Sequence, residues 1–126
     1  MRLSVVAIGR QRGGPESSLV EDYSTRIRSI GRPLGVTSFE IRKMEAPKGL
    51  SGAKRQEQES ALLKQSASPM AKRVVLDERG KNLSSADFAG QIARWRDEGA
   101  VEISFLIGGA DGHHPSLAAN ADLVIA

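Results

Sequence analysis

The sequence predicts an α/β fold in which helices flank a mostly parallel sheet, within one domain spanning residues 1–126. Apolar runs rich in β-branched residues alternate with segments of helical periodicity, as expected of parallel strands joined by helices. A chain of 126 residues can bury one core but not two ordinary ones. It has no cysteine and no long apolar run, which excludes disulfides, thiol chemistry and a membrane span. We expect a cytoplasmic protein.

The first elements are predicted to be a strand, a helix and a second strand. Residues 3–8 form a compact β-branched run that ends at Gly9, which indicates a buried strand. After a Gly-Gly-Pro break, apolar residues recur at helical spacing until Gly31 ends the helix. Residues 36–42 then predict the second strand.

The next segment is predicted to be a basic loop followed by a mostly solvated helix. Residues 43–52 contain proline and glycine, and residues 53–66 have a strongly helix-forming composition. The apolar stripe of this helix is thin, with Ala61 and Leu62 as its members and Leu63 as a further candidate. Most of the helix should therefore face water or a partner.

The second half repeats the alternation of strand and helix. Residues 73–77 predict a strand that leads into a glycine-containing loop at residues 78–82. Ser84 or Ser85 is the expected N-cap of the following helix, which Gly99 closes. That helix presents one apolar face, which we assign to the core: Phe88, Ile92 and Trp95. The remaining elements are a strand at 102–107, a short helix near 115–120 and an apolar run at 123–126.

Two strand ends are candidate ligand sites, because ligands of open α/β sheets bind beyond the carboxyl ends of the strands. One end is Leu76, and the other is Gly108 with Gly109, where bare main chain could contact a ligand. A tight turn is the alternative for the glycine pair. The spacing GGxxG matches no phosphate loop, and Asp111 would repel a phosphate. A nucleotide-like ligand of different charge is more compatible.

Other polar residues suggest structural roles. Adjacent histidines cannot both face one metal from a regular element, so we expect His113 and His114 to be exposed or capping, and we expect no metal. Asp77 and Glu78 are consecutive and point in different directions, which favours ordering of the loop over a catalytic pair. The residues present do not identify a general base.

Positive charge is concentrated in the first half of the chain. Residues 1–60 carry eleven Lys and Arg against seven Asp and Glu, whereas residues 61–126 carry seven against eight. A solvated surface and a nucleic-acid backbone are both compatible with this distribution. Seven basic residues fall in expected loops or at element ends: Arg10, Arg12, Arg42, Lys43, Lys48, Lys54 and Arg55.

Four segments of the chain are specific in combination: MRLSVVAIGR at the N-terminus, LDERGK at 76–81, a helix containing ARW, and FLIGGADG at 105–112. Together they resemble one family, the ribosomal RNA large subunit methyltransferase H family of the SPOUT superfamily. The resemblance implies a SPOUT fold with a C-terminal trefoil knot and transfer of a methyl group from S-adenosylmethionine to N3 of a pseudouridine. The implied substrate is 23S ribosomal RNA in the assembled ribosome, and the implied enzyme is a homodimer. It also implies that Leu76 and Gly109 contact the cofactor and that Gly108 shapes the same loop.

The resemblance implies further chain beyond Ala126, with another cofactor-binding loop, a long helix and a polar tail. We therefore expect residues 1–126 to be a C-terminally truncated methyltransferase domain, and the fragment alone to be inactive. Two alternatives remain: a non-catalytic ribosome- or RNA-binding module, and a small nucleotide-binding regulator. The glycine spacing speaks against the regulator.

Overall fold

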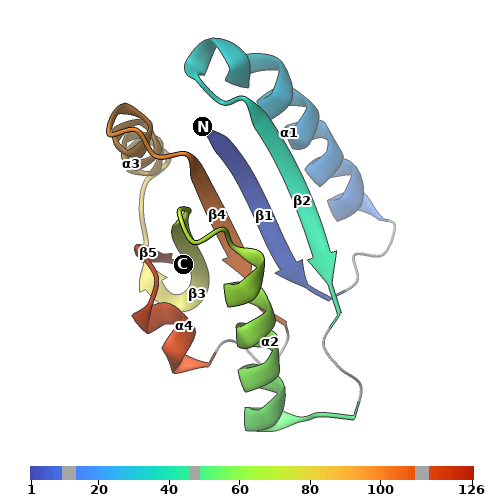
Figure 1. Ribbon diagram of the computed structural model, residues 1–126. Coiled ribbons are helices and arrows are strands. Elements are labelled where there is room, and N and C mark those ends of the chain that lie inside the picture. Colours follow the sequence, from blue (N-terminus) through green and yellow to red (C-terminus); the bar gives the residue numbers. More distant parts are fainter. Residues whose placement is uncertain (10–13, 46–48, 110–113) are drawn as a thin grey trace.

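The computed structural model confirms the predicted α/β class, with helices on both faces of a five-stranded parallel sheet (Figure 1). The strands are β1 (Arg2–Ile8), β2 (Ser38–Met44), β3 (Lys72–Lys81), β4 (Glu102–Ile107) and β5 (Leu123–Ile125). The helices are α1 (Pro15–Gly31), α2 (Gly52–Ser66), α3 (Ser85–Asp97), α4 (Pro115–Ala119) and the 3-10 turn η1 (Arg32–Leu34). The structure describes residues 1–9, 14–45, 49–109 and 114–126.

The strands lie in the order β2-β1-β4-β3-β5, and every neighbouring pair is parallel. β1 and β4 occupy central positions, where sheet neighbours on both sides satisfy their backbone groups. Both are apolar along most of their length, as expected of strands covered on two faces. All carboxyl ends consequently meet at one edge of the sheet.

Each face of the sheet has its own apolar core. Helices α2 and α4 cover one face, where the buried cluster is Val6, Ile8, Leu63, Ala67, Val75, Leu106 and Leu117. Helices α1 and α3 cover the other, where the buried cluster is Leu3, Val74, Trp95 and Ile103. The core assignment of Trp95 is confirmed, since its side chain is 7% exposed. Among the described residues, no helix is long and apolar enough to cross a bilayer.

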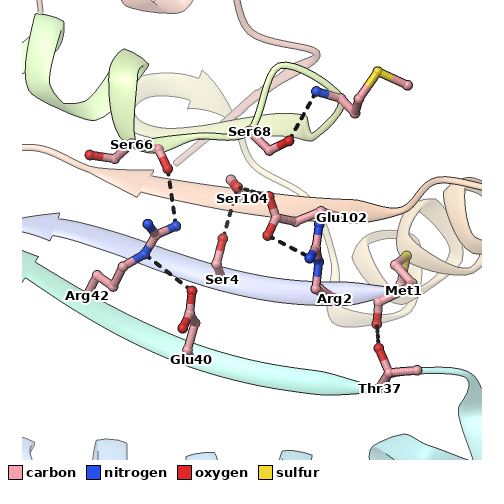
Figure 2. A network of polar contacts seen from close by, with 11 residues as sticks. Met1, Arg2, Ser4, Thr37, Glu40, Arg42, Ser66, Ser68, Glu102 and Ser104 are labelled. Atoms are coloured by element: carbon pink, nitrogen blue, oxygen red, sulfur yellow. Dashed lines mark hydrogen bonds and ion pairs between the residues drawn. The ribbon is translucent and has the colours of Figure 1, made fainter.

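A polar contact also crosses the centre of the sheet. Ser4 of β1 and Ser104 of β4 are opposite each other in the ladder, and their hydroxyl oxygens lie 2.9 Å apart in a fully buried position. Ser104 donates to a carboxylate oxygen of Glu102 at 3.4 Å, and Arg2 lies 3.8 Å from the same carboxylate (Figure 2). These groups partner one another, as buried polar groups generally do.

Several element boundaries differ from the predictions. The chain continues from α1 through η1, so β2 begins at Ser38, two residues later than expected. The segment 78–82, expected to be a loop, belongs in large part to β3, which extends to Lys81. The reason is long-range: after a register shift, Lys81 pairs with Ile125 of β5. The predicted N-cap of α3 is confirmed, because the Ser84 hydroxyl accepts a hydrogen bond from Asp87 N at 3.0 Å.

Candidate functional site

The predicted cofactor-binding residues lie together at the carboxyl edge of the sheet. Leu76 of β3 pairs with Ile107 of β4 on one side and with Ile125 of β5 on the other. Gly108 and Gly109 follow Ile107 directly. β3 continues to Lys81, so Leu76 is not at a strand end as predicted, but it is the last residue of β3 that pairs with β4. Leu76 and the two glycines therefore lie where the paired part of these neighbouring strands ends, on the side where α/β sheets bind ligands.

Gly109 is in close contact with the carboxylate of Glu59, which projects from α2. A Cβ atom on residue 109 would lie 2.6 Å from Oε2 and 3.0 Å from Oε1 of Glu59. Real Cβ atoms do not approach other atoms so closely, and only glycine fits this position without displacing the carboxylate. The space that a side chain would need at residue 109 is thus occupied by Glu59 on the α2 side. That the glycines also accommodate an adenosine moiety stays a prediction.

Glu59 was not predicted from the sequence, because the buried face of α2 was assigned from its apolar residues alone. The buried residues of the helix are Glu59, Ser60 and Leu63, whereas Ala61 is exposed and Leu62 is half-buried. The expectation of a stripe through Ala61 was therefore wrong, and polar side chains complete the buried face. A usable signal existed, since Glu59 precedes Leu63 by four residues and so shares its helix face.

Ser60, the residue after Glu59, contacts His114, which follows positions 110–113 in the chain. The backbone N–H of His114 donates to the Ser60 hydroxyl at 2.9 Å. His114 also caps α4, because its Nδ1 accepts a hydrogen bond from Ser116 N at 3.1 Å. The capping role predicted for His114 is confirmed, while His113 lies outside the described residues. Two consecutive residues of α2 thus contact Gly109 and His114, the residues that flank positions 110–113.

The segment after Leu76 belongs to β3 and is not the predicted loop, but Asp77 does bind within it. The Asp77 carboxylate accepts hydrogen bonds from Arg79 N at 2.9 Å and from the Arg79 side chain at 3.3 Å. This hydrogen bonding, with the charge of Asp77, raises the pKa of the Arg79 guanidinium. The Asp77 side chain is nearly buried, and its contacts favour a structural over a catalytic role.

The same segment of β3 lies against the end of β5. Ile125 pairs with both Leu76 and Lys81, and Ala126 N donates to the Lys81 carbonyl at 2.9 Å. A Cβ on Gly80 would lie 2.6 to 2.8 Å from backbone atoms of Ile125. The end of β5 is therefore held against the second half of β3, beside Leu76.

An apolar hollow of about 350 Å³ opens at the same edge, on the α1 face. Its walls include Val20 of α1, Ile41 of β2, and Val5 and Ile107 of the central strands. A volume of this size is within the range of small-ligand pockets. The end of β4 thus has an apolar hollow on one face and a buried carboxylate on the other.

The basic residues that the sequence singled out are not equivalent. Arg42 donates to the Ser66 carbonyl at 3.1 Å and forms an ion pair with Glu40 at 3.3 Å (Figure 2). Its guanidinium is therefore already engaged in contacts within the protein. Lys43 and Lys54 are exposed. Arg10, Arg12 and Lys48 lie outside the described residues. In the described parts of the chain, no group of three His, Cys, Asp or Glu side chains could hold a metal ion.

Comparison with known proteins matches residues 1–126 to a family described as predicted SPOUT methyltransferase. Curated proteins named Ribosomal RNA large subunit methyltransferase H are similar along nearly the whole chain. The Ruegeria pomeroyi protein is 47% identical over 126 residues, covering 99% of this chain and 78% of the relative. The Bradyrhizobium protein is 44% identical over 126 residues, covering 100% and 78%. The Cereibacter sphaeroides (strain KD131) protein is 46% identical over 125 residues, covering 99% and 77%.

Proposed function

The chain belongs to the SPOUT methyltransferase family, and on that premise we propose that it methylates large-subunit ribosomal RNA with S-adenosylmethionine as methyl donor. The observation that carries the proposal is the pairing of Leu76 with Ile107, the residue directly before Gly108 and Gly109, where the pairing of β3 with β4 ends. The finer proposal is that a cytoplasmic homodimer, with residues 1–126 in its methyltransferase domain, methylates N3 of a pseudouridine in 23S ribosomal RNA in the assembled ribosome.

Two features of the strand ends support this cofactor. Gly108 and Gly109 leave the main chain after β4 without side chains, so its amide and carbonyl groups can contact an adenosine base. The buried Glu59 carboxylate beside Gly109 adds a negative charge, which suits a cationic sulfonium compound and disfavours a nucleoside triphosphate. Leu76 would contact the donor from the neighbouring strand.

The chemistry requires no metal. When bound, S-adenosylmethionine would supply an electrophilic methyl group: its methyl carbon–sulfur bond would break as N3 of the pseudouridine bonds to the carbon, S-adenosylhomocysteine would leave, and the N3 proton would pass to a base. The chain's own residues would hold the donor at the strand ends, because fixing both reactants in line provides much of the rate. Asp77 would keep the segment beside Leu76 in place through its hydrogen bonds with Arg79. The general base stays unassigned.

The RNA side of the proposal rests on exposed basic residues. Lys43 lies near the end of β2, close to the carboxyl edge, and Lys54 lies in the first turn of α2; both are exposed. We propose that they contact ribosomal RNA phosphates, since backbone and shape contacts dominate recognition of folded RNA. Replacing both by alanine should weaken ribosome binding. It should also make the slope of log affinity against log salt concentration shallower, by the amount that about two phosphate contacts contribute.

The experiment is methyl transfer by the full-length protein to ribosomes from cells that lack the corresponding gene. Label from S-adenosylmethionine is expected at N3 of a pseudouridine in 23S ribosomal RNA, located by mass spectrometry of nuclease fragments. Gly109→Val should abolish cofactor binding and labelling, because its side chain would displace Glu59 and fill the strand end. Gly90→Ala, on α3 with nothing within 4 Å of the added atom, is the control. Ribosome binding without any cofactor binding by calorimetry would contradict the proposal and indicate an RNA-binding module.

A further inference from the structure

Glu59 is a buried carboxylate whose oxygens have no hydrogen-bond partner among the residues that the structure describes. The residue is 1% exposed, and within the described part of the chain neither Oε1 nor Oε2 receives a hydrogen bond. Arg55, one helical turn earlier, forms an ion pair with it, in which Nε lies 3.8 Å from Oε2. That separation exceeds a hydrogen bond, and the Arg55 side chain is 43% exposed.

A second buried carboxylate, that of Glu102, shows how such a group is usually accommodated. Glu102 is 7% exposed, receives a hydrogen bond from Ser104 and has Arg2 at 3.8 Å (Figure 2). Removing a carboxylate from water costs several kcal/mol unless hydrogen bonds and a counter-charge compensate. Glu59 is more deeply buried than Glu102 and has less compensation, so its oxygens are available to a donor that enters the site.

The position of Glu59 points to the ligand that would supply this donor. Its carboxylate lies against Gly109, at the end of β4, which is the proposed cofactor edge. Resting on the proposed function, we propose that Glu59 binds the α-ammonium group of the methionine moiety of the methyl donor. The ammonium combines a positive charge with three N–H donors, whereas ribose hydroxyls would satisfy the hydrogen bonds but leave the charge uncompensated.

This assignment gives Glu59 a role in affinity that is separate from the chemical step. S-adenosylhomocysteine, the product, keeps the ammonium group and should use the same contact. An analogue of S-adenosylhomocysteine in which hydrogen replaces the ammonium should lose it. A hydrogen bond between charged groups corresponds to about a ten- to hundredfold difference in affinity.

The test is calorimetry on the full-length protein with S-adenosylhomocysteine and its desamino analogue. The wild type should bind S-adenosylhomocysteine about ten- to a hundredfold more tightly than the analogue. Glu59→Gln keeps the size of the side chain and an acceptor oxygen but removes the charge, so it should reduce this ratio severalfold, to that of a neutral hydrogen bond. Glu57→Gln makes the same change at an exposed position on the same helix and should leave the ratio unchanged.

Each outcome is decisive. An unchanged ratio in Glu59→Gln overturns the inference, as does equal binding of both compounds by the wild type. The wild-type comparison decides the question alone if the variant does not fold. Wild-type protein that binds neither compound overturns the proposed function and this inference with it, whereas equal binding of both overturns the inference only.

Discussion

The backbone of Ile125 occupies the place where any side chain on residue 80 would begin. A Cβ atom of ideal geometry on Gly80 would lie 2.6 Å from the carbonyl carbon and 2.7 Å from the nitrogen of Ile125. Ile125 also pairs with Leu76 and Lys81, so the second half of β3 lies against the end of β5. Position 80 therefore requires glycine because of a contact with a residue far along the sequence.

Gly80→Ala should destabilise the protein, because backbone atoms of Ile125 cannot yield as a flexible side chain can. Overpacking of this kind typically lowers the free energy of unfolding by about 1–3 kcal/mol. Urea denaturation measures the change. Gly90→Ala is the matched control, since nothing lies within 4 Å of its added atom. Gly90 lies inside α3, so its replacement by alanine should leave the free energy of unfolding unchanged or raise it by up to about 1 kcal/mol. Equal effects at the two positions would contradict the packing described for Ile125.

Gly109→Ala should also destabilise the protein, but through a side chain. The new methyl group would meet the Glu59 carboxylate at 2.6 Å, so that side chain must move. If this clash is the cause, Glu59→Ala should remove much of the penalty in the double variant. We expect a coupling energy of about 0.5–3 kcal/mol from denaturation of the two single variants and the double variant. Additive effects would show that residues 59 and 109 do not interact.

Ser104→Ala should lower the free energy of unfolding by about 1–3 kcal/mol, because it removes a hydrogen-bond partner from buried Ser4 and from Glu102. Ser4→Ala breaks the same contact from the other side. The double variant should cost less than the sum of the single variants, since no serine hydroxyl is then left unpaired. Thermal and urea denaturation give the free energy of unfolding of each variant. A loss in the double variant equal to the sum of the two single losses would argue against the contact.

Ser84→Ala should cost about 1 kcal/mol, because it removes the hydroxyl that accepts from Asp87 N at the start of α3. Ser85→Ala is the matched control: the next residue lies inside the helix, where alanine is favourable. The difference in urea midpoint between the two variants measures the cap. If Ser85→Ala were the more destabilising change, the cap would be wrongly placed.

The main architecture followed from local signals. β4 has the predicted bounds, and β1 begins only one residue earlier than expected. Both strands were recognisable because a short β-branched run that ends at a glycine marks a buried parallel strand. The placement of the proposed cofactor-binding residues was predictable in outline: adjacent parallel strands run in the same direction, which brings Leu76 and Gly109 to one side.

What failed depended on contacts between distant segments. The extension of β3 to Lys81 requires pairing with Ile125, and a polar loop sequence carries no sign of that partner. Glu59 was missed because apolar periodicity assigns a glutamate to the solvated face of a helix. Its burial arises from Gly109, far along the sequence, whose missing side chain makes room for a carboxylate.

The most direct test of the central claim is a titration of the full-length protein with S-adenosylmethionine, followed by amide chemical shifts. If the donor binds at the carboxyl edge of β3 and β4, the largest changes should fall at Leu76, Gly108 and Gly109, with Glu59 close behind. Changes confined to the opposite edge of the sheet, around Arg2 and Glu102, or no changes at saturating donor, would contradict the account.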